Sequence, residues 1–155
     1  MNNYEQINDS CKMLWKEKFN ITKERYTQVY CYVFNEDNKL LIVKNEDNNN
    51  WTIPGGHPEV GESKEETLKR EVLEEACVTV KDIHYLGAVE VVENDEVYYQ
   101  LRYTARLDEE LPFKQEWEVS ERLFINLEDL AKYITWANGR TFKAQIESAK
   151  EYWNI

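Results

Sequence analysis

The chain has 155 residues, of which 42% are hydrophobic and 13% aromatic, and its formal net charge is −11. This length suits one domain, and the apolar content is sufficient to fill a core. The negative charge disfavours nonspecific binding to DNA, RNA or anionic membranes. It permits a small phosphorylated ligand when a metal cation mediates the contact. We therefore expect neither a nucleic-acid polymer nor a membrane among its partners.

The N-terminal segment MNNYEQINDSCKMLWKEKFN has no apolar centre of the kind that a signal peptide carries. Cys11, Cys31 and Cys77 are odd in number and lack zinc-type spacing, which predicts reduced thiols and a cytoplasmic protein. Apolar side chains recur at helical spacing near the start of the chain. We predict that residues 1–24 form a helical extension packed on a domain of residues 25–155. The residues of this apolar pattern are Ile7, Cys11, Leu14, Trp15 and Phe19.

Strand patterns dominate the middle of the chain. YTQVYCYVFNEDNKLLIVKN predicts a β-hairpin, and WTIP a short extended piece that ends at Pro54. KDIHYLGAVEVVENDEVYYQLRYTARL predicts a second pair of strands, turning near Asn94 and Asp95. RLFIN predicts a further strand, LEDLAKYI a short helix, and RTFKAQIESAKEYW a final helix. Together these elements indicate a mixed α/β domain of the α+β type.

A glutamate-rich helix is predicted between the two strand pairs. Ser63 and Glu66 have the spacing of a capping box, so the helix is expected to begin at Lys64. Leu68, Val72 and Ala76 form one apolar stripe, with Leu73 near it.

Glu71, Glu74 and Glu75 stand at i, i+3 and i+4 and share one sector of this helix. Arg70 is placed to pair with Glu66 or Glu74. Grouped carboxylates offer the hard oxygens that Mg²⁺ or Mn²⁺ prefers. The preceding glycines Gly55, Gly56 and Gly61 allow the backbone to approach a ligand closely. These residues alone leave two interpretations open, a metal–phosphate site and a solvated acidic surface.

The spacing of these residues resembles the Nudix box, G-x5-E-x7-R-E-U-x-E-E-x-G-U, where U is a bulky aliphatic residue. Every defined position matches except one, because Cys77 replaces the late glycine. The upstream segments KLLIVKN and WTIPGG are also similar to those of the family. The resemblance implies an α/β/α sandwich with a mixed sheet from about Tyr26 onward, with the predicted N-terminal helix as an addition. The matching positions are Gly56, Glu62, Arg70, Glu71, Val72, Glu74, Glu75 and Val78.

The resemblance also implies a reaction, hydrolysis of a phosphoanhydride bond in a nucleoside diphosphate linked to another moiety, with Mg²⁺ or Mn²⁺. By carry-over, Glu74 and Glu75 are metal ligands, and the Gly55 carbonyl and Glu71 are further ligands. Arg70 orients the carboxylates, and Glu62 belongs to the same network. Glu71 is also a candidate to deprotonate the water. The general base is sought in a later loop as well, at Glu116, Glu118 or Glu121, with Glu118 favoured.

Two other functions stay open beside hydrolysis. One is a nucleotide- or metabolite-binding regulatory module without catalysis. The other is a diphosphate isomerase that would use Cys31. The substrate subclass is open too. No proline follows the box at the distance seen in ADP-ribose hydrolases, which counts against that subclass and leaves a nucleoside triphosphate or a small nucleoside diphosphate conjugate. A homodimer is a further expectation, formed through the leading helix or a strand edge.

Several single residues carry expectations of their own. Cys77 is expected in a left-handed helix cap. His57 is either a phosphate contact or a solvated loop residue, and His84 is expected on a strand surface. Aromatic side chains that could stack on a base, or belong to the core, are Trp51, Tyr98, Tyr99, Trp117 and Trp136.

Overall fold

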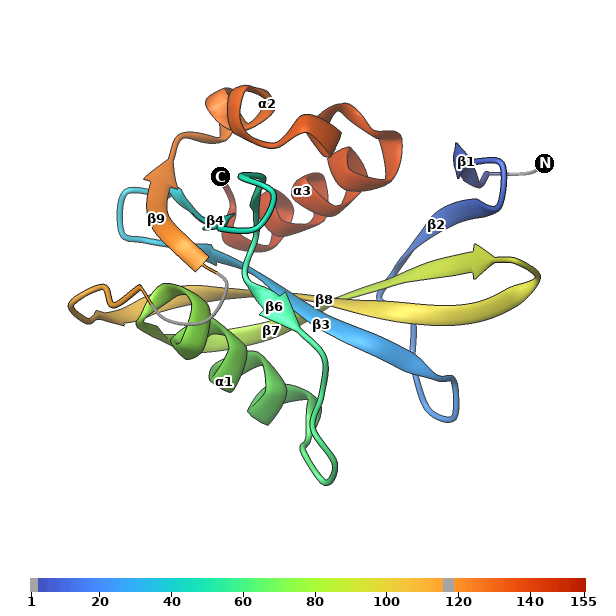
Figure 1. The fold of residues 1–155 in the computed structure, drawn as a ribbon, viewed down its shortest axis with the longest axis horizontal. Helices are drawn as coiled ribbons and strands as arrows, with labels where there is room; N and C mark the ends of the chain where they lie inside the picture. The colour runs from blue at the N-terminus through green and yellow to red at the C-terminus, as the bar shows by residue number, and fades with distance from the viewer. Residues whose placement is uncertain (1–2, 116–118) are drawn as a thin grey trace.

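The computed structural model describes residues 3–115 and 119–155. Figure 1 shows a twisted sheet with helix α1 on one face and helices α2 and α3 on the other, so the predicted α/β/α sandwich is confirmed. The helices are α1 (Lys64–Ala76), α2 (Leu130–Tyr133) and α3 (Arg140–Trp153), with 3-10 turns η1 (Leu127–Asp129) and η2 (Thr135–Asn138). The strands are β1 (Glu5–Asn8), β2 (Cys11–Glu17), β3 (Tyr26–Phe34), β4 (Leu40–Asn45), β5 (Trp51–Thr52), β6 (Gly55–Gly56), β7 (Val78–Glu93), β8 (Glu96–Glu110) and β9 (Val119–Ile125).

The sheet is mixed, with the strand order β1-β2-β7-β8-β3-β4-β5. Strands β3 and β8 are parallel, and the other pairs are antiparallel. The predicted hairpin of β7 and β8 is confirmed, with positive φ at Asn94 and Asp95 in its turn. The predicted hairpin of β3 and β4 is also present, but its strands pair only at Phe34 and Leu40. Beyond that pair they diverge, β9 joins β4, and β6 joins β3. This split of the sheet admits the Gly55–Gly56 segment.

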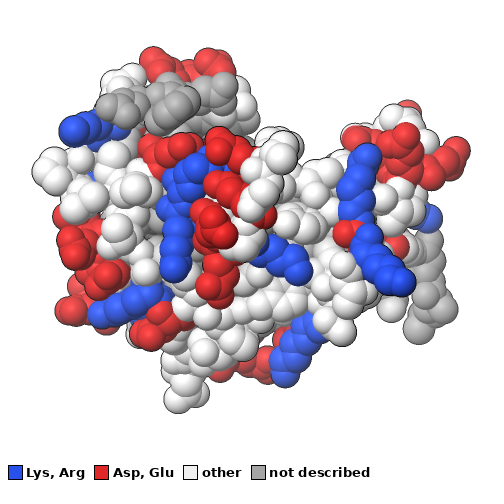
Figure 2. Space-filling view, turned by 90° about the horizontal axis from the view of Figure 1, so that it is seen from below, with Lys and Arg blue, Asp and Glu red and all other residues white. Residues whose placement is uncertain are grey.

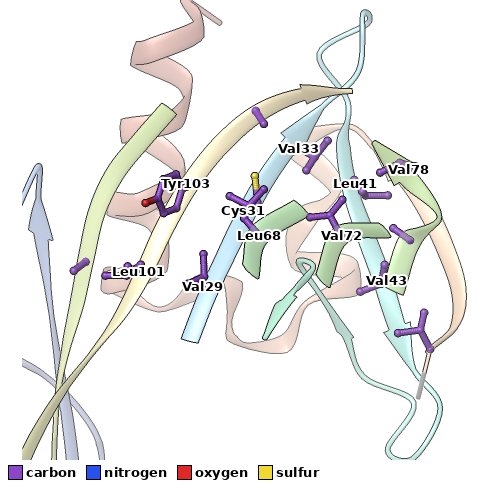
Figure 3. Close-up of a cluster of buried hydrophobic side chains, with 14 of the residues drawn as sticks. Val29, Cys31, Val33, Leu41, Val43, Leu68, Val72, Val78, Leu101 and Tyr103 are labelled. Carbon is purple, nitrogen blue, oxygen red and sulfur yellow. The ribbon is translucent and has the colours of Figure 1, made fainter. Parts of the chain in front are cut away.

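The continuous apolar runs of β3 and β4 follow from burial on both faces of the sheet. Alternate residues of these strands enter two different cores. Val29, Cys31, Val33, Leu41 and Val43 face α1, where Figure 3 shows them around Leu68 and Val72 of the helix. Tyr32, Phe34, Leu40 and Ile42 face the opposite way and pack with Phe142 and Ile146 of α3. Both helical layers are therefore held to the same pair of strands.

The predicted N-terminal helix is wrong, because residues 5–17 form the hairpin of β1 and β2. Asn8 closes the turn, since its Oδ1 accepts hydrogen bonds from Ser10 N at 2.9 Å and Ser10 Oγ at 3.0 Å. Strand β2 then pairs with β7 from Cys11 to Glu17. Alternate side chains of β2 cover one face, a strand period that the spacing of these residues also permits. Strands β1 and β2 therefore extend the shared sheet.

The three cysteines are free thiols, as predicted; Cys11 and Cys31 are buried and Cys77 is partly exposed. Within residues 3–115 and 119–155, no helix is long and apolar enough to cross a lipid bilayer.

Candidate functional site

Helix α1 has the predicted start and the predicted end. Ser63 Oγ accepts a hydrogen bond from Glu66 N at 3.1 Å, and Ser63 N donates to Glu66 Oε1 at 3.4 Å, which completes the capping box. Cys77 adopts the left-handed conformation at φ 55° and ψ 42°. Arg122 donates to the carbonyl oxygens of Ala76 and Cys77 at 2.7 and 3.1 Å, so the helix end keeps its geometry without glycine.

The apolar stripe of α1 is narrower than predicted. Leu68, Val72 and Ala76 are fully buried, but the Leu73 side chain is 43% exposed. The opposite sector carries charge, and Figure 2 shows acidic side chains gathered around basic ones on the face that bears this helix. The contacts of Arg70 explain this gathering.

Arg70 is the centre of the carboxylate cluster. Its Nε and Nη2 donate to Glu62 at 2.5 and 3.0 Å. Its Nη1 donates to Glu71 at 2.9 Å and to Glu74 at 3.2 Å. Nη2 also donates to the carbonyl of His57 at 2.9 Å, which ties the glycine-rich loop to the helix. The predicted pairing with Glu74 is confirmed, while Glu66 serves the helix cap instead. One guanidinium therefore relieves much of the repulsion among three glutamates.

The pKa values of two of these glutamates move in opposite directions. Hydrogen bonds from Arg70, supported by the backbone of Glu59, lower the pKa of Glu62 to about 2. Burial raises the pKa of Glu71, although Arg70 opposes that rise. The carboxyl group of Glu71 packs closely against Gly56. A Cβ built at Gly56 would lie 2.5 Å from the carboxyl carbon of Glu71. The absence of a side chain at Gly56 thus leaves the space that Glu71 occupies.

Glu75 reaches the split in the sheet. Gly55 N donates to Glu75 Oε1 at 2.8 Å, and Gly55 pairs with Tyr30 of β3. A Cβ at Gly55 would collide with the backbone of β3 and with the Tyr30 ring. Burial raises the pKa of Tyr30, and the charges of Glu75 and Glu71 raise it further. Tyr30 therefore lies within electrostatic reach of the carboxylates.

The remaining predicted site residues have other contacts or fall outside the described part of the chain. Glu116 and Glu118, the proposed bases, fall outside the described residues, and Glu121 forms an ion pair with Lys44 at 3.5 Å. His57 Nδ1 donates to the carbonyl of Thr27 at 2.7 Å, so its ring anchors the loop. His84 lies on β7, as predicted, and stacks on Tyr152 at 3.7 Å.

Most of the aromatic candidates serve packing. Tyr99 is buried and stacks on Phe19 at 5.0 Å, and Trp51 meets Tyr133 edge-on at 5.7 Å. Tyr98 donates to Glu93 at 3.2 Å. Trp117 falls outside the described residues. Trp136 is 45% exposed and lines a pocket, so it alone of the four described candidates faces an open space beside the site.

That pocket has a volume of about 400 Å³ and lies between the N-terminal hairpin, the sheet and the start of α3. Tyr30, Thr52 and Ile53 line it. Thr52 and Ile53 shortly precede Gly55 in the sequence, and Tyr30 pairs with Gly55 across the strands. Gly55 N in turn donates to Glu75. Arg102 of β8 also lines it and is buried, with 9% of its surface exposed. Sequence reasoning missed Tyr30 and Arg102, although an arginine between Leu101 and Tyr103 in the strand pattern YYQLRYTARL was a visible signal.

No group of three carboxylate, imidazole or thiol side chains converges as ready metal ligands in the described part of the chain. Glu71 and Glu74 accept hydrogen bonds from Arg70, and Glu75 accepts one from Gly55 N. The chemistry of the set nevertheless fits a hard divalent cation, because three carboxylates gather beside the glycine segment and present only oxygen donors.

Comparisons with known proteins find relatives in sequence and in fold. The NUDIX domain model matches residues 24–145. A Bacillus subtilis (strain 168) protein provisionally named 8-oxo-dGTP diphosphatase is 47% identical over 51 residues, which are 32% of this chain and 34% of that protein. The aligned stretch thus spans about a third of the length of the curated relatives.

Solved structures also share the fold. A mutant form of the Bacillus subtilis pyrophosphohydrolase BsRppH has a TM-score of 0.79 at 21% identity, covering 92% of each chain. The NUDIX domain of Shewanella oneidensis NrtR, complexed with ADP ribose, has a TM-score of 0.65 at 22% identity, covering 85% of this chain and 90% of that one.

Proposed function

The chain belongs to the NUDIX family, and we propose that it is a hydrolase that cleaves a phosphoanhydride bond of a nucleoside diphosphate linked to another moiety. The observation that carries this proposal is the placement of the carboxylates on α1. Glu71, Glu74 and Glu75 lie around Arg70 and Gly55, beside the split in the sheet where a pocket opens. A nucleotide with its phosphates at the carboxylates and its remainder in the pocket would span both features.

We propose Mg²⁺ or Mn²⁺ as the cofactor, held by Glu71, Glu74 and Glu75 with the Gly55 carbonyl. When bound, such a cation would neutralise charge on the phosphate oxygens and make the attacking water more acidic. The protein's own part is to hold the oxygens in place. Arg70 does this for Glu71 and Glu74 through its Nη1 at 2.9 and 3.2 Å. Glu62 in turn fixes the guanidinium through two hydrogen bonds.

The base that takes a proton from water is proposed to be Glu118, with Glu71 as the second candidate. The raised pKa of Glu71 supports a role in proton transfer, because a carboxylate with a higher pKa is a stronger base. Cys31 lies fully buried in β3 among apolar side chains, and burial raises the pKa of its thiol. These surroundings argue against the isomerase that would need Cys31 as an exposed acid.

The test is turnover of nucleoside triphosphates, ADP-ribose, nucleotide sugars and dinucleoside polyphosphates with Mg²⁺, Mn²⁺ or chelator. Glu75→Gln and Glu74→Gln are expected to lower turnover by about two orders of magnitude or more while the fold survives. Glu65→Gln is the matched control, because Glu65 is an exposed residue of the same helix and the substitution removes the same charge. Equal turnover in all three variants would refute the proposal. Binding without turnover across the panel would support the regulatory module instead.

Its partners are proposed to be small nucleotides, in keeping with the net charge of −11. The cytoplasmic location and the homodimer stay predictions. The exposed edge for a dimer would now be strand β1 or β5, since β1 and β5 end the strand order.

A further inference from the structure

Arg102 is a buried cation with no carboxylate bound to it among the described residues. Its Nε donates to Gln145 Oε1 at 2.9 Å, Nη1 to the Leu101 carbonyl at 3.2 Å, and Nη2 to Gln100 Oε1 at 3.0 Å. All three acceptors are neutral. Burial accordingly lowers the pKa of Arg102, although Tyr32 and Tyr30 oppose that fall, and a buried charge is costly unless another group compensates it. The side chain lines the pocket, so a ligand there could supply further acceptors.

The remaining donors form a matched pair. A guanidinium carries five N–H groups, and the contacts above use one on each nitrogen. Tyr32, which donates to the same Gln145 Oε1, also contacts the guanidinium. Among the described residues, the hydrogen bonds above leave a second N–H on each terminal nitrogen, and these two nitrogens form the forked end of the group. Tyr30 covers one guanidinium face at 4.9 Å, because the two residues are paired on the parallel strands β3 and β8. The plane of the fork is thus fixed before a ligand arrives.

The rest of the pocket suits a flat, uncharged aromatic group. Trp136 and Phe142 meet edge-on at 4.5 Å on one side, and Ile53 and Val89 add apolar walls. A volume of about 400 Å³ falls in the range of small-molecule sites. Glu5, which also lines the pocket, makes it less suitable for a second phosphate or carboxylate. A nucleobase fits between these walls. The phosphates of the same nucleotide would bind at the carboxylates of α1.

We propose that this pocket holds the base of the substrate and that Arg102 selects a 6-oxopurine, guanine or hypoxanthine, over adenine. This inference rests on the proposed function. Guanine and hypoxanthine present two adjacent acceptors, O6 and N7, which match a forked pair of donors. Adenine places an amino group where O6 would be, so one arginine N–H would face another donor. The pocket would then bind the base, and the carboxylates of α1 would bind the phosphates of the same molecule.

The first test is calorimetric binding of GMP, IMP, AMP and 7-deaza-GMP to the unaltered chain. All four carry the same phosphate, so differences report the base. GMP and IMP are expected to bind about ten-fold or more tightly than AMP, as for other bidentate arginine contacts. 7-Deaza-GMP lacks the N7 acceptor and is expected to lose most of that advantage, and 8-oxo-GMP, which carries a hydrogen on N7, is expected to behave likewise. AMP or 7-deaza-GMP binding as tightly as GMP would overturn the inference.

The second test is Arg102→Lys, which keeps the charge and removes the fork. The matched control is Arg106→Lys on the same strand, because Arg106 binds Asn35 and Asn38 and does not line the pocket. The preference for GMP over AMP should vanish in the first variant and persist in the second. Should Arg102→Lys fail to fold, the 7-deaza comparison decides alone. Hydrolysis without base preference would overturn only this inference, whereas base-selective binding without hydrolysis would overturn only the proposed function.

Discussion

Replacing Gly56 by alanine is expected to damage the carboxylate cluster with little loss of stability. The new Cβ would lie 2.5 to 2.7 Å from the three carboxyl atoms of Glu71. To reach the 3.4 Å of ordinary contact, the carboxyl group must retreat by about 0.9 Å. It can do so because it is the far end of a flexible side chain, so the fold should lose only about 1 kcal/mol. The move displaces the Glu71 carboxylate from the position in which Arg70 now donates to it at 2.9 Å.

A displacement of about 1 Å in a catalytic group can reduce a rate by roughly 10²-fold. We therefore expect kcat of Gly56→Ala to fall to that extent, and Tm to fall by about 2–4 °C. Gly61→Ala is the control, with a similar loss of stability and no contact with the carboxylates. Gly61 has φ +84° and nothing within 4 Å of a built Cβ, so alanine there strains the backbone by about 1 kcal/mol and should leave kcat unchanged. Steady-state kinetics with thermal denaturation measure both quantities. Full activity in Gly56→Ala would refute the assigned place of Glu71.

The remaining predictions concern one helix end and two carboxylates. Cys77→Gly should be more stable than Cys77→Ala by about 1 kcal/mol in thermal denaturation, because both lose the thiol and only glycine relieves the left-handed cap; equal Tm values would contradict this. The pKa of Glu62 is lowered to about 2, so its stabilisation is complete above its ordinary pKa near 4.5 and is lost as the pH falls toward 2. Glu62→Gln should therefore flatten the fall in Tm between about pH 5 and 2.5, and parallel curves would refute the assignment. Glu118→Gln should lower kcat by about 10²–10⁴-fold if that residue is the base, and an unchanged pH–rate profile would transfer the role to Glu71.

The fold shows where local pattern suffices and where it fails. The hairpin of β7 and β8 was predictable because its turn and both strands are adjacent in sequence. The N-terminal segment was not, since its apolar residues satisfy a helical and a strand spacing alike. Pairing along the whole of β2 with β7 decided in favour of the strand, and these two segments are far apart in the sequence. The parallel pairing of β3 with β8 was likewise beyond sequence patterns.

The amino-acid sequence by itself determined helix α1, its capping box, its left-handed end and the grouping of its glutamates. Each of these depends on residues within about one or two turns of one another, where spacing fixes geometry. Only the tertiary structure decided what stands opposite them. The divergence of β3 from β4 brings Gly55 to Glu75, and the register of β3 with β8 sets Tyr30 over Arg102. These contacts join segments from distant parts of the chain, so they arise from the packing of the whole sheet and its helices.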